Sequence, residues 1–160
     1  IVCIEDQLNV DKDNAQLWAD LGFLLVISHQ YERSLVWINK VLEQNPHDEL
    51  ALLNKSTALH KLYRFEEALK LCAEAPPTPN LLIMQAISYD GCYKNKECAD
   101  SCLEVLKSEP ENCGALLYLG FAELSLNRFD EADQRFKEVV DITNNLVFDQ
   151  QEALTQLQTN

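Results

Sequence analysis

The residues of this chain with the greatest potential for chemistry are its cysteines. Cys98 and Cys102 lie four residues apart, and a spacing of four places two side chains on one face of a helix. Cys92 and Cys113 are close to them in the sequence, but a zinc site needs about four ligands and no histidine lies in this segment. Free cysteine is among the residue types most often buried in protein cores. We therefore interpret these thiols as packing residues and predict no metal site.

Motifs that support catalysis or cofactor binding are missing from the sequence. It contains no glycine-rich phosphate loop, no serine nucleophile elbow and no zinc-binding histidine pair. The three histidines lie far apart and have no evident nucleophile beside them: His29, His47 and His60. The carboxylates are numerous but scattered, as solvated charges usually are. The sequence therefore predicts a protein that is not an enzyme and that holds no cofactor.

Charge and composition exclude further classes of partner. Lys and Arg number 13 against 26 Asp and Glu, which gives the 160 residues a net charge of −13. Because nucleic-acid binding depends on neutralising phosphates, we expect no nucleic-acid ligand. The longest apolar run is far shorter than the roughly 20 residues that a membrane span needs. Six cysteines without a C-x-x-C pair favour reduced thiols, and hence a cytoplasmic or nuclear setting.

The elements that position these residues are predicted to be helices. Only four glycines and five prolines interrupt a chain that is 47% hydrophobic, which argues against sheets with many hairpin turns. A period of 34 residues then recurs along the sequence. From Trp18 it leads to Leu52, and after a shortened second unit it leads from Leu82 to Leu116. We therefore expect about four helical hairpins.

Two columns of this repeat contain only small residues. The first holds Gly22, Ser56, Ala86 and Gly120, and the second holds Ser34, Ala68, Cys98 and Ala132. Two helices can approach closely only where neither contributes bulk, so we expect both columns where the helices of a hairpin cross. Larger residues such as Ile38 and Phe136 are expected to fill the space between these crossings. Asn95 replaces the aromatic residue expected at the bend, which predicts a looser third turn.

The repeat resembles the tetratricopeptide repeat (TPR) family. The family pattern of Trp-x-x-Leu-Gly, then Ala, then Phe, then Pro is most complete in the first unit. Its residues there are Trp18, Leu21, Gly22, Ser34, Ile38 and Pro46. It returns in the fourth unit as Leu119, Gly120, Ala132 and Phe136, with Asn144 in place of the final proline. The resemblance implies an all-α fold, an α-solenoid in which antiparallel helix hairpins stack into a right-handed superhelix.

The pattern describes one array. We expect four TPR-like repeats at residues 15–48, 49–78, 79–112 and 113–145, of which the second is shortened. Residues 1–14 look like the end of a preceding repeat, so we expect a fragment of a longer protein. In residues 146–160 the apolar side chains share one helical face, and Asp149 is placed to cap a helix there. We interpret this last segment as a C-terminal capping helix.

The resemblance also implies that the first helix of each hairpin lines a concave face. Several of these helices keep apolar or uncharged residues after those that pack within the hairpin are set aside. The predicted partner-binding residues are Ala19, Phe23, Val26, Ile27, Leu53, Asn54, Thr57, Ile83, Ile87, Leu117, Phe121 and Leu124. Phe23 and Phe121 are the expected anchors, because aromatic residues are enriched in binding hot spots. The alternative is that these side chains pack on neighbouring repeats, on the terminal helix or in a homodimer.

One function of the family requires cations that this sequence lacks. Some TPR co-chaperones hold the acidic C-terminal tail of the large heat-shock chaperones with a clamp of Lys, Asn and Arg side chains. The matching positions here are Ala19, Phe23, Asn54, Asn80 and Met84, and only Asn54 fits. A carboxylate buried there would lack the charged partners that it needs, so we do not expect this function.

The sequence therefore predicts a non-catalytic adaptor or scaffold that binds a peptide or amphipathic helix of another protein in a largely apolar concave groove. Two alternatives stay open. The first is a TPR chaperone of the type III secretion kind, which serves secreted substrates and has about this size and charge. The second is a structural repeat array whose apolar surface is buried in a homo-oligomer or a larger complex.

Overall fold

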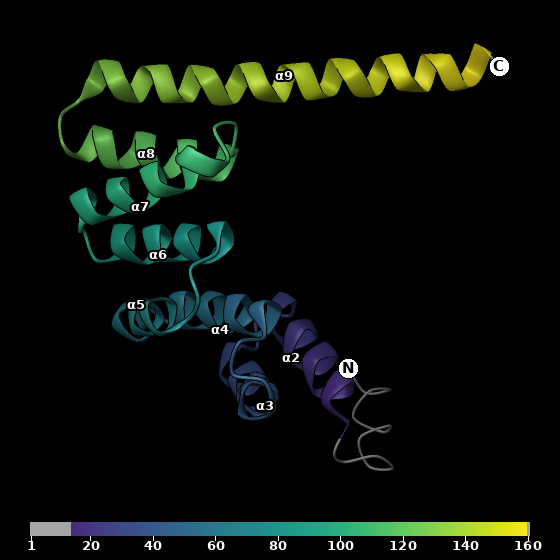
Figure 1. The fold of residues 1–160 in the computed structure, drawn as a ribbon, viewed down its shortest axis with the longest axis vertical. Coiled ribbons are helices and arrows are strands. Elements are labelled where there is room, and N and C mark those ends of the chain that lie inside the picture. Colours follow the sequence, from purple (N-terminus) through teal and green to yellow (C-terminus); the bar gives the residue numbers. More distant parts are fainter. Residues whose placement is uncertain (1–13, 160) are drawn as a thin grey trace. The chain divides into compact units, whose positions relative to one another are not determined.

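The computed structural model describes residues 14–159, with the side chains of residues 14–147, and this part of the chain has helices and no strands. Figure 1 shows its helices: α2 (Ala15–Ile27), α3 (Tyr31–Gln44), α4 (Glu49–Lys61), α5 (Phe65–Glu74), α6 (Pro79–Gly91), α7 (Asn95–Ser108), α8 (Cys113–Ser125) and α9 (Phe129–Thr159). They fall into two compact units, with α2 to α6 in the first (Ile1–Tyr93) and α7 to α9 in the second (Lys94–Asn160). The predicted all-α fold is confirmed. No helix within residues 14–159 combines the length and the apolar character needed to cross a membrane.

Along the chain, the helices fall two by two within the ranges expected for the repeats. Residues 15–48 hold α2 and α3, residues 49–78 hold α4 and α5, and residues 79–112 hold α6 and α7. α8 lies within 113–145, and α9 begins in the same range. The segment expected to end a preceding repeat lies outside the described residues, apart from Asn14. The division into repeats and the right-handed superhelix stay predictions.

The first helix of each pair begins at a side-chain cap. Asn14, Asp48, Thr78 and Asn112 each accept a hydrogen bond from the backbone N–H three residues further on, over 3.2, 2.9, 3.3 and 3.0 Å. A polar side chain at this place satisfies one of the N–H groups that a helix start leaves unpaired. These caps therefore fix where α2, α4, α6 and α8 begin.

The turn between the two helices of a pair has the same backbone form at all four places. His29, Tyr63, Tyr93 and Asn127 have φ angles of 59, 59, 58 and 60°, in the left-handed region that glycine usually occupies after a helix. The backbone N–H of Tyr93 donates to the carbonyl of Asp90 over 2.9 Å, as its counterparts do at 2.9 or 3.0 Å in the other turns. In the other three turns the N–H groups of Gln30, Arg64 and Arg128 also donate to the carbonyl five residues earlier, and the looser third turn expected from Asn95 stays a prediction.

The small-residue columns lie at helix contacts, as predicted. A Cβ atom on Gly22 would lie 2.9 Å from Cγ1 of Ile38, and one on Gly120 would lie 2.6 Å from Cε1 of Phe136. Real Cβ atoms do not approach other atoms this closely, so any larger residue at these places would force the facing side chain to shift. The paired large side chain fills the space that the glycine leaves.

The second hairpin makes the same contact, but the side-chain volume is divided differently between its two helices. The Ser56 hydroxyl lies 3.7 Å from the sulfur of Cys72, and both side chains are buried. Here the residue of the first helix is larger than glycine, and the residue of the second helix is smaller than isoleucine. Cores tolerate changes that conserve total volume. The residue of the first helix and the residue that faces it on the second helix can therefore vary together, while the helices keep the same approach.

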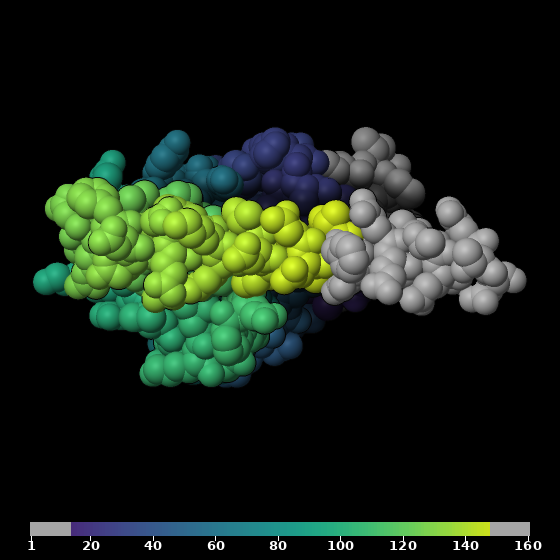
Figure 2. All heavy atoms as spheres, turned by 90° about the horizontal axis from the view of Figure 1, so that it is seen from above, coloured from purple at the N-terminus to yellow at the C-terminus, as the bar shows by residue number. Residues whose placement is uncertain are grey.

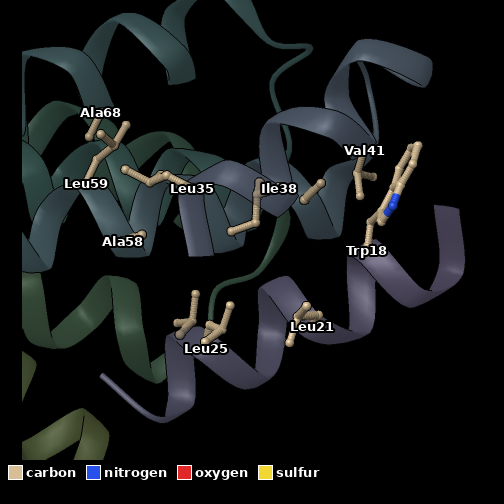
Figure 3. Close-up of a cluster of buried hydrophobic side chains, with 11 residues drawn as sticks. Trp18, Leu21, Leu25, Leu35, Ile38, Val41, Ala58, Leu59 and Ala68 are labelled. Carbon is tan, nitrogen blue, oxygen red and sulfur yellow. The ribbon is translucent and has the colours of Figure 1, made fainter. Parts of the chain in front are cut away.

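The core of the first unit lies where α2 meets α3 and α4. Figure 3 shows Leu21 and Leu25 of α2 beneath Ile38 of α3, in a cluster that continues to α4 and α5. Val26 is part of this cluster and is only 8% exposed. Because α2 packs against α4 as well as α3, Val26 lies inside the core. This corrects the prediction that Val26 belongs to an open concave face.

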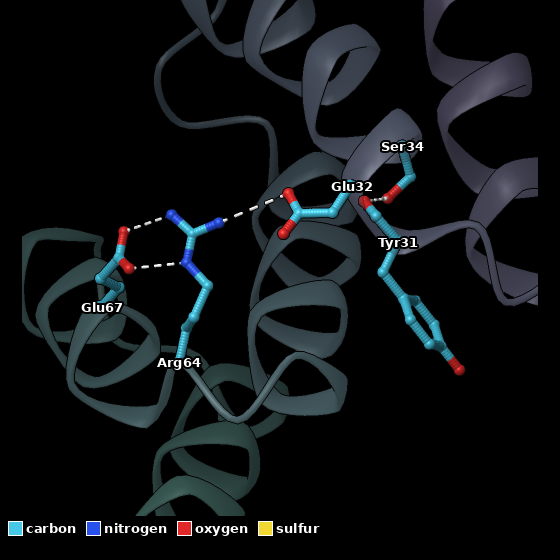
Figure 4. A network of polar contacts seen from close by, with 5 residues as sticks. All are labelled: Tyr31, Glu32, Ser34, Arg64 and Glu67. Atoms are coloured by element: carbon cyan, nitrogen blue, oxygen red, sulfur yellow. Dashed lines mark hydrogen bonds and ion pairs between the residues drawn. The ribbon is translucent and has the colours of Figure 1, made fainter.

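An ion-pair network connects the first two hairpins near their turns (Figure 4). Arg64 donates through Nε and Nη2 to the two carboxylate oxygens of Glu67 on α5, over 2.6 and 2.7 Å. Its Nη1 lies 3.7 Å from Glu32 on α3. Because these side chains are exposed to water, the network adds little stability, but it orients the turn between α4 and α5 against α3.

The second unit ends in α9, a single helix of 31 residues. Residues 146–159 continue this helix without a break, so the separate C-terminal capping helix is wrong, and Asp149 lies inside α9 instead of at a helix start. The physical reason is Asn144, since Pro46 and Pro110 follow the ends of α3 and α7 at the matching positions. Figure 2 shows the described part of α9, in yellow-green, uncovered along the face in view.

A buried carboxylate links α8 to α9. Glu123 is buried, and Nε of Arg135 lies 3.8 Å from its Oε2. These two atoms form no hydrogen bond, while Nη1 of Arg135 donates to Glu138 over 3.2 Å. Burial raises the pKa of the Glu123 carboxyl above its usual range, and the nearby Arg135 offsets only part of this effect.

Gly120→Ala should destabilise the second unit, although alanine is the better helix former by about 1 kcal/mol. The new methyl group would meet the ring of Phe136, and overpacking of this kind costs about 1–3 kcal/mol. Urea unfolding followed by circular dichroism measures the change. Phe136→Leu in the same chain should restore part of the loss, because it removes the ring that the methyl group meets. A Gly120→Ala protein as stable as the unaltered chain would contradict this contact.

Glu123→Gln should stabilise the second unit at neutral pH but not at acidic pH. Because the pKa of Glu123 is raised in the folded state, the folded protein binds this proton more tightly than the unfolded chain does. The stability that this group contributes is fully present below the unfolded-state pKa and is lost as the pH rises through the folded-state pKa. Urea titrations at about pH 4 and about pH 7 should favour the variant only at the higher pH, by up to about 1 kcal/mol.

The matched control for this variant is Glu97→Gln, which changes an exposed carboxylate on α7. It should leave the pH dependence of the free energy of unfolding as it is. If Glu123→Gln behaves like the control, burial does not raise the pKa of the Glu123 carboxyl.

Candidate partner-binding cleft

A cleft of about 200 Å³ opens in the first unit, between α2 and α4. Its ten lining residues come from α2, α3 and the beginning of α4: Gln16, Ala19, Asp20, Phe23, Ile38, Val41, Asp48, Leu50, Ala51 and Asn54. The caps at Asn14 and Asp48 set the first residues of α2 and α4, and therefore decide which side chains of each helix face the cleft. Three of the predicted partner-binding residues meet here: Ala19, Phe23 and Asn54.

The cleft has an apolar floor and an apolar rim. Ile38, Val41 and Ala51 are buried and form the floor. At the rim, Phe23 is 44% exposed and Leu50 is 60% exposed. Large apolar side chains left open beside a hollow are typical of binding surfaces. The cleft can receive an apolar side chain of another molecule, and that side chain would cover Phe23 and Leu50 together.

The polar groups of the cleft are acidic or uncharged. Oδ1 of Asp20 accepts a hydrogen bond from Gln16 over 2.8 Å, and Oδ1 of Asp48 accepts one from the backbone N–H of Ala51 over 2.9 Å. Within residues 14–147 the second oxygen of each carboxylate has no hydrogen-bond partner, and no cation forms an ion pair with it. The half-buried amide of Asn54 likewise makes no hydrogen bond to these residues. The cleft therefore offers free acceptors and one free amide.

The other predicted residues of the first unit lie outside the cleft. Ile27 is exposed at the end of α2. Leu53 is partly buried against the small core cluster between α4, α5 and α6, and the Thr57 hydroxyl donates to its carbonyl over 2.9 Å. Ile83 and Ile87 are partly buried on α6. The side chains of Leu53 and Val26 are therefore used for packing on neighbouring helices.

In the second unit, the predicted residues form a separate apolar patch on α8. Phe121 is 45% exposed and Leu124 is 40% exposed, while Leu117 is partly buried. The ring centroid of Phe121 lies 5.5 Å from that of Phe136 and 6.0 Å from that of Tyr118. One side of the Phe121 ring is therefore held by aromatic neighbours, and the rest of it stays accessible.

Several cleft residues were missed by the sequence analysis. Leu50 could have been found, because it lies four residues before Asn54 and so shares a helix face with it. Asp20 and Gln16 share the corresponding face of α2, one turn and two turns before Phe23. The position of Asp48 had no such signal, since it depends on where the start of α4 meets α2. Only the structure shows that Asp48 lines the cleft.

The cysteines take part in packing. Cys98 and Cys102 are fully buried, and the sulfur of Cys98 lies 3.8 Å from the carbonyl oxygen of Tyr118. Burial raises the pKa of the Cys72 thiol, so this group stays protonated and unreactive at neutral pH. In the described part of the chain, no group of three or more His, Cys, Asp or Glu side chains is placed to hold a metal ion. The packing role predicted for Cys98 and Cys102 is confirmed.

Several solved structures have the same architecture. A MamA protein from Desulfovibrio magneticus RS-1 matches with a TM-score of 0.76 and 20% identity, over 89% of this chain and 82% of that chain. TTC0263, a TPR protein of Thermus thermophilus, matches with a TM-score of 0.73 and 18% identity, over 82% of this chain and 75% of that chain. YrrB, described as a TPR protein with an unusual peptide-binding site, matches with a TM-score of 0.67 and 16% identity, over 87% of this chain and 74% of that chain. No protein-family model matches the sequence, and no curated protein matches it.

At these identities the likeness concerns the fold, and the side chains of this chain support the same conclusion. Small residues stand where paired helices touch, at Gly22, Ser56 and Gly120, and a polar cap opens the first helix of each pair. These contacts follow the period of 34 residues that the sequence shows. The chain therefore has the fold of the tetratricopeptide repeat family, as its sequence pattern predicted.

Proposed function

We propose that this chain is a non-catalytic protein-interaction module, an adaptor or scaffold that holds a peptide or amphipathic helix of a partner protein in the α2–α4 cleft. The observation that carries the proposal is the apolar floor bordered by Phe23 and Leu50, two large side chains left partly open to water. A groove of this kind suits the apolar face of a helix or the alternate side chains of an extended segment.

Phe23 and Leu50 are the anchors of the proposed contact. Fully burying a Phe or Leu side chain stabilises by about 1.5–3 kcal/mol, so covering the exposed parts of both is worth about 2 kcal/mol in total. The partner gains a similar amount from its own apolar side chain. Since aromatic residues dominate binding hot spots, the larger share of this energy falls to Phe23.

Asn54 gives the bound segment its direction. Its amide can donate and accept a hydrogen bond at once, which is the pattern that a peptide backbone offers in return. Because this amide is half-buried and makes no hydrogen bond within residues 14–147, a bound backbone would satisfy it without breaking an existing bond. Hydrogen bonds of this kind orient a ligand whose affinity comes from apolar contacts.

Two further observations support the proposal. Phe121 and Leu124 place a second partly open apolar surface on α8 of the second unit, which is available to the same or another partner. YrrB, which has the same fold, is described with a peptide-binding site. This likeness supports peptide binding as the use of the fold in this chain.

Phe23→Glu should abolish peptide binding without changing the fold. The test selects random peptides displayed on phage against the full chain and measures the dissociation constant of the selected peptides by fluorescence anisotropy. A charge in place of the anchor ring removes its apolar contact and desolvates a carboxylate, so we expect at least a tenfold loss, which corresponds to about 1.4 kcal/mol. Circular dichroism should show unchanged helix content, because Phe23 is not a core residue.

The matched control is Phe129→Glu, which makes the same change at an exposed position at the start of α9. It should leave the affinity unchanged. Peptides that bind equally well to the Phe23→Glu chain would remove the cleft as the binding site. A chain that selects no peptide at all would count against the proposed function itself.

A further inference from the structure

We infer that the occupant of the α2–α4 cleft is a cationic segment, in which the apolar side chain that enters the cleft is flanked by Lys or Arg. This inference rests on the proposed function and adds the charge of the partner to it. Among the ten lining residues, the charged ones are both acidic: Asp20 and Asp48. The charge of the cleft is therefore complementary to a basic partner.

Within residues 14–147, the structural contact of Asp20 is the hydrogen bond that it accepts from Gln16, and an uncharged asparagine could accept it as well. Asp20 is the single charged residue of α2, a helix that is otherwise apolar apart from Gln16. Aspartate is a poor helix former in a helix interior. The helix dipole stabilises an anion only within the first turn of a helix, and Asp20 lies beyond the first turn of α2. Its free oxygen faces no cation within residues 14–147, so a ligand is the natural source of its counter-charge.

Asp48 has a structural role that uses only one of its oxygens. Oδ1 caps α4 by accepting the N–H of Ala51, and Oδ2 has no partner among the described residues. The carboxylate therefore keeps a free acceptor beside Leu50 at the edge of the cleft. The helix dipole of α4 also favours a negative charge at this place, but the uncharged Asn14 and Asn112 cap α2 and α8 through the same hydrogen bond, so a cap does not need the charge.

Several described cations of the first unit lie beside groups outside the cleft, and Lys55 of α4 interacts with Glu67 of α5. Lys40 lies over the ring of Trp37, at 4.5 Å from its centroid, and Arg64 pairs with acidic groups near the turns. Lys61 follows Asp48 by thirteen residues, which is about 20 Å along α4. This exceeds twice the screening length of about 8 Å at physiological salt, so Lys61 does not neutralise the cleft.

Lys and Arg fit the remaining features of the site. Their hydrocarbon stems pack along apolar surface while the charged head stays near water. A stem of this kind can cover the exposed side chain of Leu50 while its head pairs with Asp48. The net charge of −13 also attracts cationic segments over longer distances and repels acidic ones. The charge thus selects the partner, and the apolar floor holds it.

The peptide selection described above also tests this inference. The peptides enriched on the unaltered chain should carry Lys or Arg beside Leu, Phe or Met. Asp20→Asn and Asp48→Asn remove one charge each but keep the hydrogen bonds, since asparagine also accepts and also caps. Each substitution should raise the dissociation constant about threefold to fivefold, and the effect should shrink at high salt because ion pairs are screened. Glu43→Gln removes an exposed carboxylate of α3 outside the cleft and should leave the affinity unchanged.

The outcomes separate this inference from the proposed function. Selected peptides that are neutral or acidic, or that bind the two asparagine variants unchanged, overturn the inference, while loss of their binding in the Phe23→Glu chain keeps the function. An empty selection, or binding that ignores Phe23→Glu, removes both. Self-association of the unaltered chain that Phe23→Glu abolishes, measured by light scattering, would make a second copy the occupant and also overturns the inference.

Discussion

The structure depends on one contact that recurs from hairpin to hairpin, the close approach of two helices over a small residue. At Gly22 and Gly120 a Cβ atom would displace the side chains of Ile38 and Phe136, and at Ser56 a hydroxyl meets a thiol. The backbone of the first helix is thereby drawn against the second helix. Because successive residues of a helix are about 100° apart, the next residue must point away from this contact. The same contact that closes a hairpin therefore also directs a side chain outward.

The side chains that point outward are the ones that a partner can contact. Phe23 follows Gly22 and Phe121 follows Gly120, and these two rings are 44% and 45% exposed. In the first unit, the packing of α2 against α4 adds a second wall and turns the exposed ring into the rim of a cleft. Packing and the proposed binding thus use two sides of one helix, and the position of the glycine sets which residue faces which side.

Local patterns predicted most of the fold and part of the site. The small-residue columns act over one hairpin, so their spacing alone indicated the helices of each hairpin and the outward position of Phe23. Val26 was misplaced because its burial depends on α4, which packs against α2 from beyond the hairpin. Asp48 was missed for the same reason, since its place in the cleft depends on how the start of α4 packs against α2. Asn144 was noted as a departure from the pattern, yet its consequence, an uninterrupted α9, required the structure.

The central claim, that a partner segment docks between α2 and α4, is tested most directly by a chemical-shift map of the full chain titrated with a selected basic peptide. The account predicts the largest shifts for the backbone and side-chain resonances of Phe23, Leu50 and Asn54, with smaller changes in the buried core beneath them. Shifts that leave these three residues unchanged and gather instead on the outer face of α9 would contradict it.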